Sequence, residues 1–107
     1  MITLEGAATG LDFAIEELYA TGWRPADPSG CESADNGRAY PGLELVRREF
    51  EACGHSLQTR HVQLFDCYRA QWLDAQGQTL GAVVGQSETE AAVYALSQFR
   101  RRSVPTG

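Results

Sequence analysis

Lysine is absent from the chain, and all nine basic residues are arginine. A GC-rich coding sequence explains this absence without any function. The functional explanation is recognition of carboxylate or phosphate by guanidinium groups, which requires arginines gathered on one face. Only Arg100, Arg101 and Arg102 are consecutive, and residues 1–99 carry six arginines against fourteen acidic residues, a balance of −8. Because an acidic body repels phosphate backbones at long range, nucleic acid is not the expected partner.

Cysteine is scarce and irregularly spaced. Cys31, Cys53 and Cys67 are an odd number and form no CxxC pair, which argues against a disulfide framework and fits a reducing cytosol. Residues 1–6 have neither the basic stretch nor the apolar stretch of a signal peptide. Every uninterrupted apolar run is far shorter than a membrane span. We therefore expect a soluble cytoplasmic protein without membrane contact.

Motifs for nucleotide binding or hydrolysis are also missing: the chain has no P-loop, GxGxxG, GxSxG or HExxH. A nucleophilic pair such as Cys67 with His61 would need a stabilised thiolate and a third, orienting group, and the sequence shows no local pattern for one. The sequence therefore assigns no catalytic residue and no cofactor.

Two sets of residues resemble metal ligands without matching a metal site. Cys53, His55, His61 and Cys67 follow the spacing C-x-H-x5-H-x5-C, which is no zinc finger or ribbon pattern. We expect the two cysteines to be small buried residues and both histidines to be polar-face residues. A calcium loop that began at Asp27 would need a bidentate acid at its twelfth position, where the chain has arginine. No metal is expected.

Hydrophobic periodicity predicts three helices, over residues 10–21, 43–53 and 87–102. Thr9 is the expected N-cap of the first, and Ser87 and Glu90 form a capping box at the last. The last turn of the third helix carries the three consecutive arginines, which would complement the helix dipole. The apolar faces comprise Leu11, Ile15, Leu18 and Tyr19; Leu43, Val46, Phe50 and Cys53; and Ala92, Ala95, Leu96 and Phe99.

Alternating residues predict strands over residues 57–63, 67–73 and 79–84. The second strand should present Tyr68, Ala70 and Trp72 to the core, and residues 74–77 form the hairpin turn that follows it. Gly81 indicates a bulge or a close backbone neighbour in the third strand. The expected fold is a single α+β domain over residues 1–107, a small antiparallel sheet of two to three strands with three helices, in the order α-α-β-β-β-α.

Residues 24–42 show no periodicity and are rich in proline, glycine and short polar residues. A nineteen-residue loop is uncommon within one domain and is usually either functional or disordered. Trp23 and Tyr40 flank this loop and could present aromatic anchors of the kind that protein interfaces use. We predict that these two residues bind a partner.

The helix, three strands and final helix over residues 42–102 resemble in outline the α-β-β-β-α arrangement of double-stranded RNA-binding domains. The resemblance implies basic residues at the start of the last helix, which in that family meet the phosphates. Here that start contains Glu88 and Glu90, of the opposite charge. The same outline also resembles small bacteriophage and prophage accessory proteins.

Three functional hypotheses follow from the sequence. The first is a small acidic protein-interaction module (an adaptor, inhibitor or accessory subunit) with a protein partner or self-association. The second is a nucleic-acid-binding module that uses Arg69 and the arginines at 100–102. The third is a small enzyme or ligand-binding domain. A contiguous basic face that joined Arg60 and Arg69 to the three C-terminal arginines would favour the second hypothesis, and a deep cleft around Cys67 or a histidine would favour the third.

Overall fold

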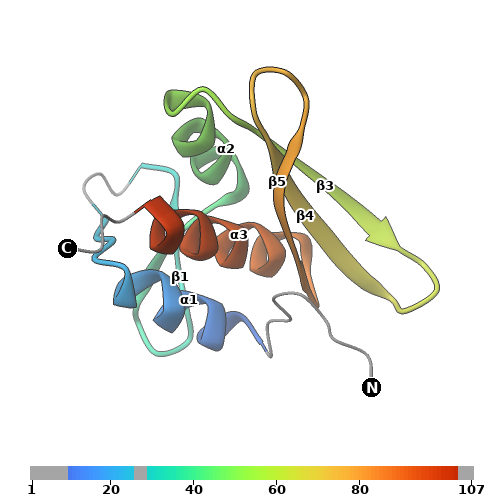
Figure 1. Cartoon of the computed structure of the whole chain (residues 1–107). Helices are drawn as coiled ribbons and strands as arrows, with labels where there is room; N and C mark the ends of the chain where they lie inside the picture. Colours follow the sequence, from blue (N-terminus) through green and yellow to red (C-terminus); the bar gives the residue numbers. More distant parts are fainter. Residues whose placement is uncertain (1–9, 26–28, 104–107) are drawn as a thin grey trace.

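A computed structural model describes residues 10–25 and 29–103 (Figure 1). The chain forms the α+β fold that the sequence predicts, with an additional small hairpin between the first two helices. The elements in chain order are α1 (Leu11–Ala20), β1 (Cys31–Ser33), β2 (Ala39–Pro41), α2 (Leu43–Ala52), β3 (Ser56–Val62), β4 (Cys67–Leu73), β5 (Thr79–Gly85) and α3 (Glu88–Ser103).

The main sheet is antiparallel, in the order β3-β4-β5, and its two faces differ in composition. Leu57 pairs with Trp72, and Ala70 pairs with Val83. These four side chains are buried. Because side chains alternate along a strand, the residues between them lie on the opposite face. All three helices lie on the side of the buried face, so no described helix or strand covers the other face of the sheet (Figure 1).

Helix α3 is the centre of the fold and lies between α1 and the sheet (Figure 1). Every side chain from Ala91 to Ser97 is buried. Helix α2 packs on the same face of the sheet, where the Phe50 ring lies 5.8 Å from the Trp72 ring and 4.9 Å from the Phe99 ring, between centroids. The periodic apolar stripes of all three helices therefore meet in one core, which the sequence predicted. Cys53 is the exception, because it follows the last turn of α2 and is exposed.

The start of α3 has the capping geometry that the sequence predicts. The Ser87 hydroxyl accepts a hydrogen bond from the Glu90 N–H at 3.1 Å. The buried Glu90 carboxylate accepts one from the Gln86 N–H at 3.0 Å and one from the Gly10 N–H at 3.4 Å. It thus reaches one residue beyond the usual capping-box partner. This carboxylate joins the beginnings of α1 and α3.

The segment 24–42 contains more structure than the sequence predicted. Strands β1 and β2 pair through Glu32 and Tyr40, and the chain turns between them at Gly37, which has a φ of 84°. Strands of three residues are too short to produce a visible alternation, which explains why the segment was expected to be a loop. Two residues named above, the cap Thr9 and the loop acid Asp27, lie outside the described residues.

Among the described helices, none has the length and apolar character needed to cross a bilayer.

Candidate functional site

Trp23 and Tyr40, which the sequence predicted to bind a partner, are both buried. Trp23 is 5 % exposed, its indole N–H donates to Glu49 at 3.0 Å, and its ring meets the edge of the Tyr19 ring at 5.6 Å. Tyr40 is 8 % exposed within the small hairpin. An indole can be buried once its polar N–H has a partner. Both rings therefore contact mainly their own chain and offer little surface to a partner.

The three C-terminal arginines bind other parts of the same chain. Arg100 Nε donates to the Thr21 hydroxyl at 2.9 Å, and Arg102 donates to the Leu80 carbonyl at 3.4 Å. Arg101 pairs with Glu17 at 2.5 Å. These contacts fasten the last turn of α3 to α1 and to β5. The arginines lie on the helical side of the sheet and form no continuous face with Arg60 and Arg69.

The four cysteine and histidine residues of the irregular motif occupy two separate places. Cys53 and His55 precede β3, whereas His61 and Cys67 lie at its far end. Six residues of extended strand separate the two histidines by roughly 20 Å. His61 Nε2 lies 3.0 Å from Asp66, and the His55 ring meets the edge of the Phe99 ring at 5.2 Å. Within the described residues, no three or more His, Cys, Asp or Glu side chains are arranged to hold a metal ion.

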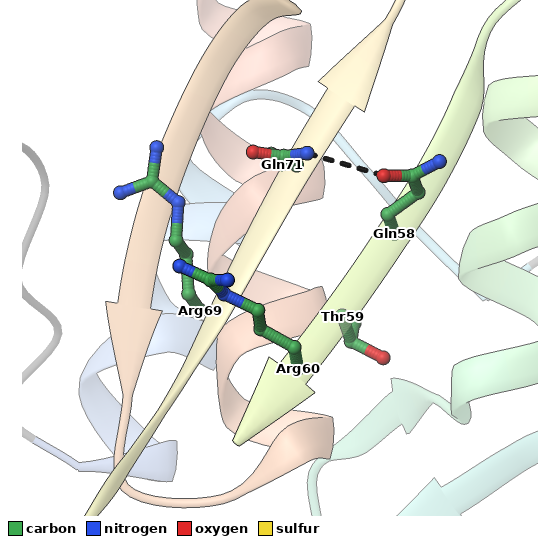
Figure 2. A pocket seen from close by; sticks show the side chains of 5 residues that line it. All are labelled: Gln58, Thr59, Arg60, Arg69 and Gln71. Carbon is green, nitrogen blue, oxygen red and sulfur yellow. Dashed lines mark hydrogen bonds between the residues drawn. The ribbon is translucent and has the colours of Figure 1, made fainter. Parts of the chain in front are cut away.

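The uncovered face of the sheet carries two pairs of polar residues on β3 and β4. Arg60 is the register partner of Arg69, and Gln58 is the register partner of Gln71. Gln71 donates to the Gln58 amide oxygen at 3.1 Å, while the Arg60 side chain reaches across β4 (Figure 2). These four residues line a hollow of about 320 Å³, to which Thr59 also contributes, although the Thr59 hydroxyl donates to Glu88 on the helical side of the sheet. We call this surface the outer face.

Two like charges stand directly opposite each other on the outer face. Opposed like charges destabilise an antiparallel pair. Among the described residues, neither guanidinium has an ion pair or a hydrogen bond, since every ion pair lies elsewhere. Arg60 is exposed and Arg69 is half-buried. Guanidinium and amide groups bind anions and peptide groups but are poor nucleophiles and proton acceptors. The chemistry of the outer face is therefore that of recognition.

The hairpin between β3 and β4 ends in two large apolar residues. Leu64 is 84 % exposed and Phe65 is 69 % exposed. The turn has a defined backbone, because the Phe65 N–H donates to Val62 at 3.3 Å and the Asp66 N–H donates to Gln63 at 3.2 Å. Asp66 adopts a φ of 48°, a conformation that aspartate tolerates better than most residues. The two apolar side chains are thus presented by an ordered turn.

The hairpin tip directly follows the outer face along β3 and β4. Val62 and Cys67 are the last register pair before the turn, on the same side of the sheet as the arginine pair. They connect Arg60 and Arg69 to Leu64 and Phe65. The sequence analysis missed the tip because residues 63–66 contain neither glycine nor proline. Two adjacent large apolar residues between two alternating segments were the available signal.

A second hollow, of about 340 Å³, lies beside the small hairpin and is lined by Trp23, Cys31, Glu49 and Arg100 among others. The charged side chains of this hollow already make hydrogen bonds within the chain. Glu49 accepts from the indole, and Arg100 donates to Thr21. A ligand there would have to displace contacts that hold the helices together, so the outer face is the better candidate.

Comparison with family models, curated proteins and solved structures finds no match to this chain.

Proposed function

We propose that this protein is a small protein-interaction module (an adaptor, inhibitor or accessory subunit) and that it binds its partner through the β3–β4 hairpin. The observation that carries the proposal is the exposure of Leu64 and Phe65 at 84 % and 69 % on an ordered turn. Burying such a side chain contributes about 1.5–3 kcal/mol. Phenylalanine is also enriched at protein interfaces. The hairpin takes the place of Trp23 and Tyr40 as the proposed partner-binding element.

The place proposed for this interaction is the cytoplasm. Among the described residues, Cys53 and Cys67 form no disulfide. Free thiols persist in reducing compartments.

Nucleic-acid binding is the second candidate, and the unpaired Arg60 and Arg69 favour it. Two observations weigh against it. Arg101 is paired with Glu17, and the side chains of Arg100 and Arg102 are held within the chain by Thr21 and by the Leu80 carbonyl. The body of the chain is acidic, which opposes the approach of a polyanion.

The test is affinity capture from cells of the source organism with quantitative mass spectrometry. Wild-type protein is compared with Leu64→Ser/Phe65→Ser and with Leu80→Ser, since Leu80 is another exposed apolar residue, 41 % exposed, on a different strand. We expect one protein to be enriched by the wild type and by Leu80→Ser but lost with the double variant. As a control, the urea midpoints of the wild type and both variants are measured, and equal values show that the substitutions leave the fold intact.

Two outcomes would overturn the proposal. One is a capture profile that the double variant leaves unchanged. The other is sub-micromolar, salt-sensitive binding of labelled oligonucleotides that Arg100→Ala/Arg101→Ala/Arg102→Ala or Arg60→Gln abolishes, because arginine contacts to phosphate weaken steeply with salt. Sedimentation velocity on the same proteins shows whether the partner is a second copy of the chain.

A further inference from the structure

We infer that the outer face binds an acidic, extended segment of the partner protein, with a carboxylate held between Arg60 and Arg69 and an apolar side chain against Leu64 and Phe65. This inference rests on the proposed function and specifies the chemistry of the partner.

The first argument is charge complementarity. Arg60 and Arg69 are register partners, and neither has an acidic partner among the described residues. A carboxylate placed between them would accept charge-assisted hydrogen bonds from both guanidinium groups and remove their mutual repulsion. The position between Arg60 and Arg69 is therefore suited to a single negative charge supplied by a partner.

The second argument concerns the two glutamines. Gln71 donates to the Gln58 amide oxygen at 3.1 Å, which leaves the Gln58 amide N–H groups and the Gln71 amide oxygen available (Figure 2). The Gln58 N–H groups are hydrogen-bond donors, and the Gln71 oxygen is an acceptor. A peptide backbone offers a C=O and an N–H to match them, so this pair is suited to an extended chain lying across the strands.

The third argument distinguishes a protein segment from a nucleic acid. Successive bases usually stack on several aromatic side chains, whereas this binding surface offers one exposed ring, Phe65 at the tip. The outer-face residues of β3 and β4 are not aromatic: they are Ser56, Gln58, Arg60, Val62, Cys67, Arg69, Gln71 and Leu73. The net charge of −5 repels a polyanion at long range. One or two carboxylates, in contrast, are attracted locally, within a Debye length of about 8 Å.

The spacing of the two subsites limits the ligand. Leu64 is four positions after Arg60, which corresponds to at most roughly 13 Å of extended backbone. A ligand in extended conformation would span that distance with about four residues. The proposed motif is therefore an Asp or Glu separated from a large apolar residue by about three positions.

Isotopically labelled full-length protein is titrated with short synthetic peptides that carry glutamate and phenylalanine at this spacing. The NMR shifts of the protein's amide groups measure binding. The matched peptide has glutamine in place of glutamate. We expect the glutamate peptide to shift amides of β3, β4 and residues 63–66, and to bind about tenfold or more tightly than the glutamine peptide. Arg60→Gln and Arg69→Gln should each weaken binding by a similar factor. Arg48→Gln, which removes an exposed arginine from α2, should bind as the wild type does.

The results that would refute the acidic motif differ from those that would refute the proposed interaction module. Equal affinity for the glutamate and glutamine peptides would refute the acidic motif, while loss of the captured partner with Leu64→Ser/Phe65→Ser would leave the interaction module standing. A single-stranded oligonucleotide that bound more tightly than the glutamate peptide, and lost affinity in both arginine variants, would show that the outer face binds phosphate instead.

Discussion

Gly81 and Trp72 are register partners on β5 and β4, and the indole ring occupies the space where a side chain at position 81 would begin. A Cβ at that position would lie 2.7 Å from Trp72 Cη2 and 2.8 Å from Cε2. The ladder slips at this point, because Trp72 pairs with Gly81 whereas Leu73 pairs with Thr79, so that Leu80 has no partner. Glycine therefore allows the largest aromatic side chain of the sheet to lie flat against the neighbouring strand.

Replacing Gly81 with alanine should destabilise the protein by about 1–3 kcal/mol, the usual range for overpacking a core. Trp72 is 2 % exposed and packs against Phe50, so a shift of its ring would disturb the core. Urea denaturation measures the change. Trp72→Phe supplies the control, since a smaller ring should reduce the cost of Gly81→Ala in the double variant. A cost that is the same in both backgrounds would show that the strain arises elsewhere.

Leu96 should be among the most sensitive residues of α3. It is 1 % exposed at the centre of the core, and truncation of such a side chain leaves a cavity. Leu96→Ala is expected to reduce the free energy of unfolding by about 2–5 kcal/mol. Gln98→Ala, at a half-buried position of the same helix, should have a much smaller effect. A urea midpoint that hardly moved in Leu96→Ala would contradict the packing of α3 on the sheet.

Alkaline pH should destabilise the protein through two tyrosines. Burial raises the pKa of Tyr40 above its usual value of 10.0, and Glu32 and Asp35 raise it further. Burial also raises the pKa of Tyr94, with a further contribution from Glu17 that Arg101 partly opposes. The folded state then binds more protons than the unfolded state above pH 10. The stabilisation is complete below pH 10 and is lost as pH rises through the raised pKa values.

The absence of lysine makes this effect measurable, because tyrosine is the only side chain in the sequence whose ordinary pKa lies near 10. Urea midpoints should fall between about pH 10 and 12, and the slope should be smaller in Tyr40→Phe and in Tyr94→Phe. A reducing agent is needed, since thiols are prone to oxidation at alkaline pH. Midpoints that stay constant above pH 10 would contradict the assignment.

Elements that arise from local chemistry were predictable. Strand β4 has the expected bounds, Cys67–Leu73, because its alternation is strict and a glycine-containing turn follows it. The capping serine of α3 was equally visible, since its partner lies three residues away. Gly81 was correctly identified as a site of close approach or bulging. These features depend on neighbours along the chain or on one unusual residue.

The surface was predicted less well, because exposure depends on distant contacts. Trp23 is buried since Glu49, twenty-six residues away, accepts its indole N–H. The exposed pair Leu64 and Phe65 lies in a turn whose sequence contains neither glycine nor proline. The pairing of Arg60 with Arg69 depends on the strand register, which the uncertain end of β3 left open.

Purified protein should contain no stoichiometric zinc. Cys53 and His55 lie at one end of β3, while His61 and Cys67 lie at the other, roughly 20 Å away. A tetrahedral site needs all of its ligands within about 2.3 Å of the ion. Elemental analysis of protein prepared without a chelator is the measurement. Stoichiometric zinc that disappeared in Cys53→Ser or His61→Ala would show that these residues converge in solution.

Removing one arginine of the outer face should stabilise the free protein. Opposed like charges cost on the order of a few tenths of a kcal/mol in a strand pair. Arg60→Gln should therefore be more stable than Arg48→Gln at low ionic strength. The comparison with Arg48→Gln is necessary because each variant makes the net charge more negative by one, from −5.

The difference between the two variants should shrink with salt, because the Debye length falls from about 30 Å at 0.01 M to about 3 Å at 1 M. Urea midpoints at several salt concentrations measure it. The same substitution is expected to weaken binding of the acidic peptide, so that stability and binding change in opposite directions. If Arg60→Gln were instead less stable than Arg48→Gln at low salt, the guanidinium would be making a favourable contact within the chain, and the outer face would have no unbalanced charge to offer a partner.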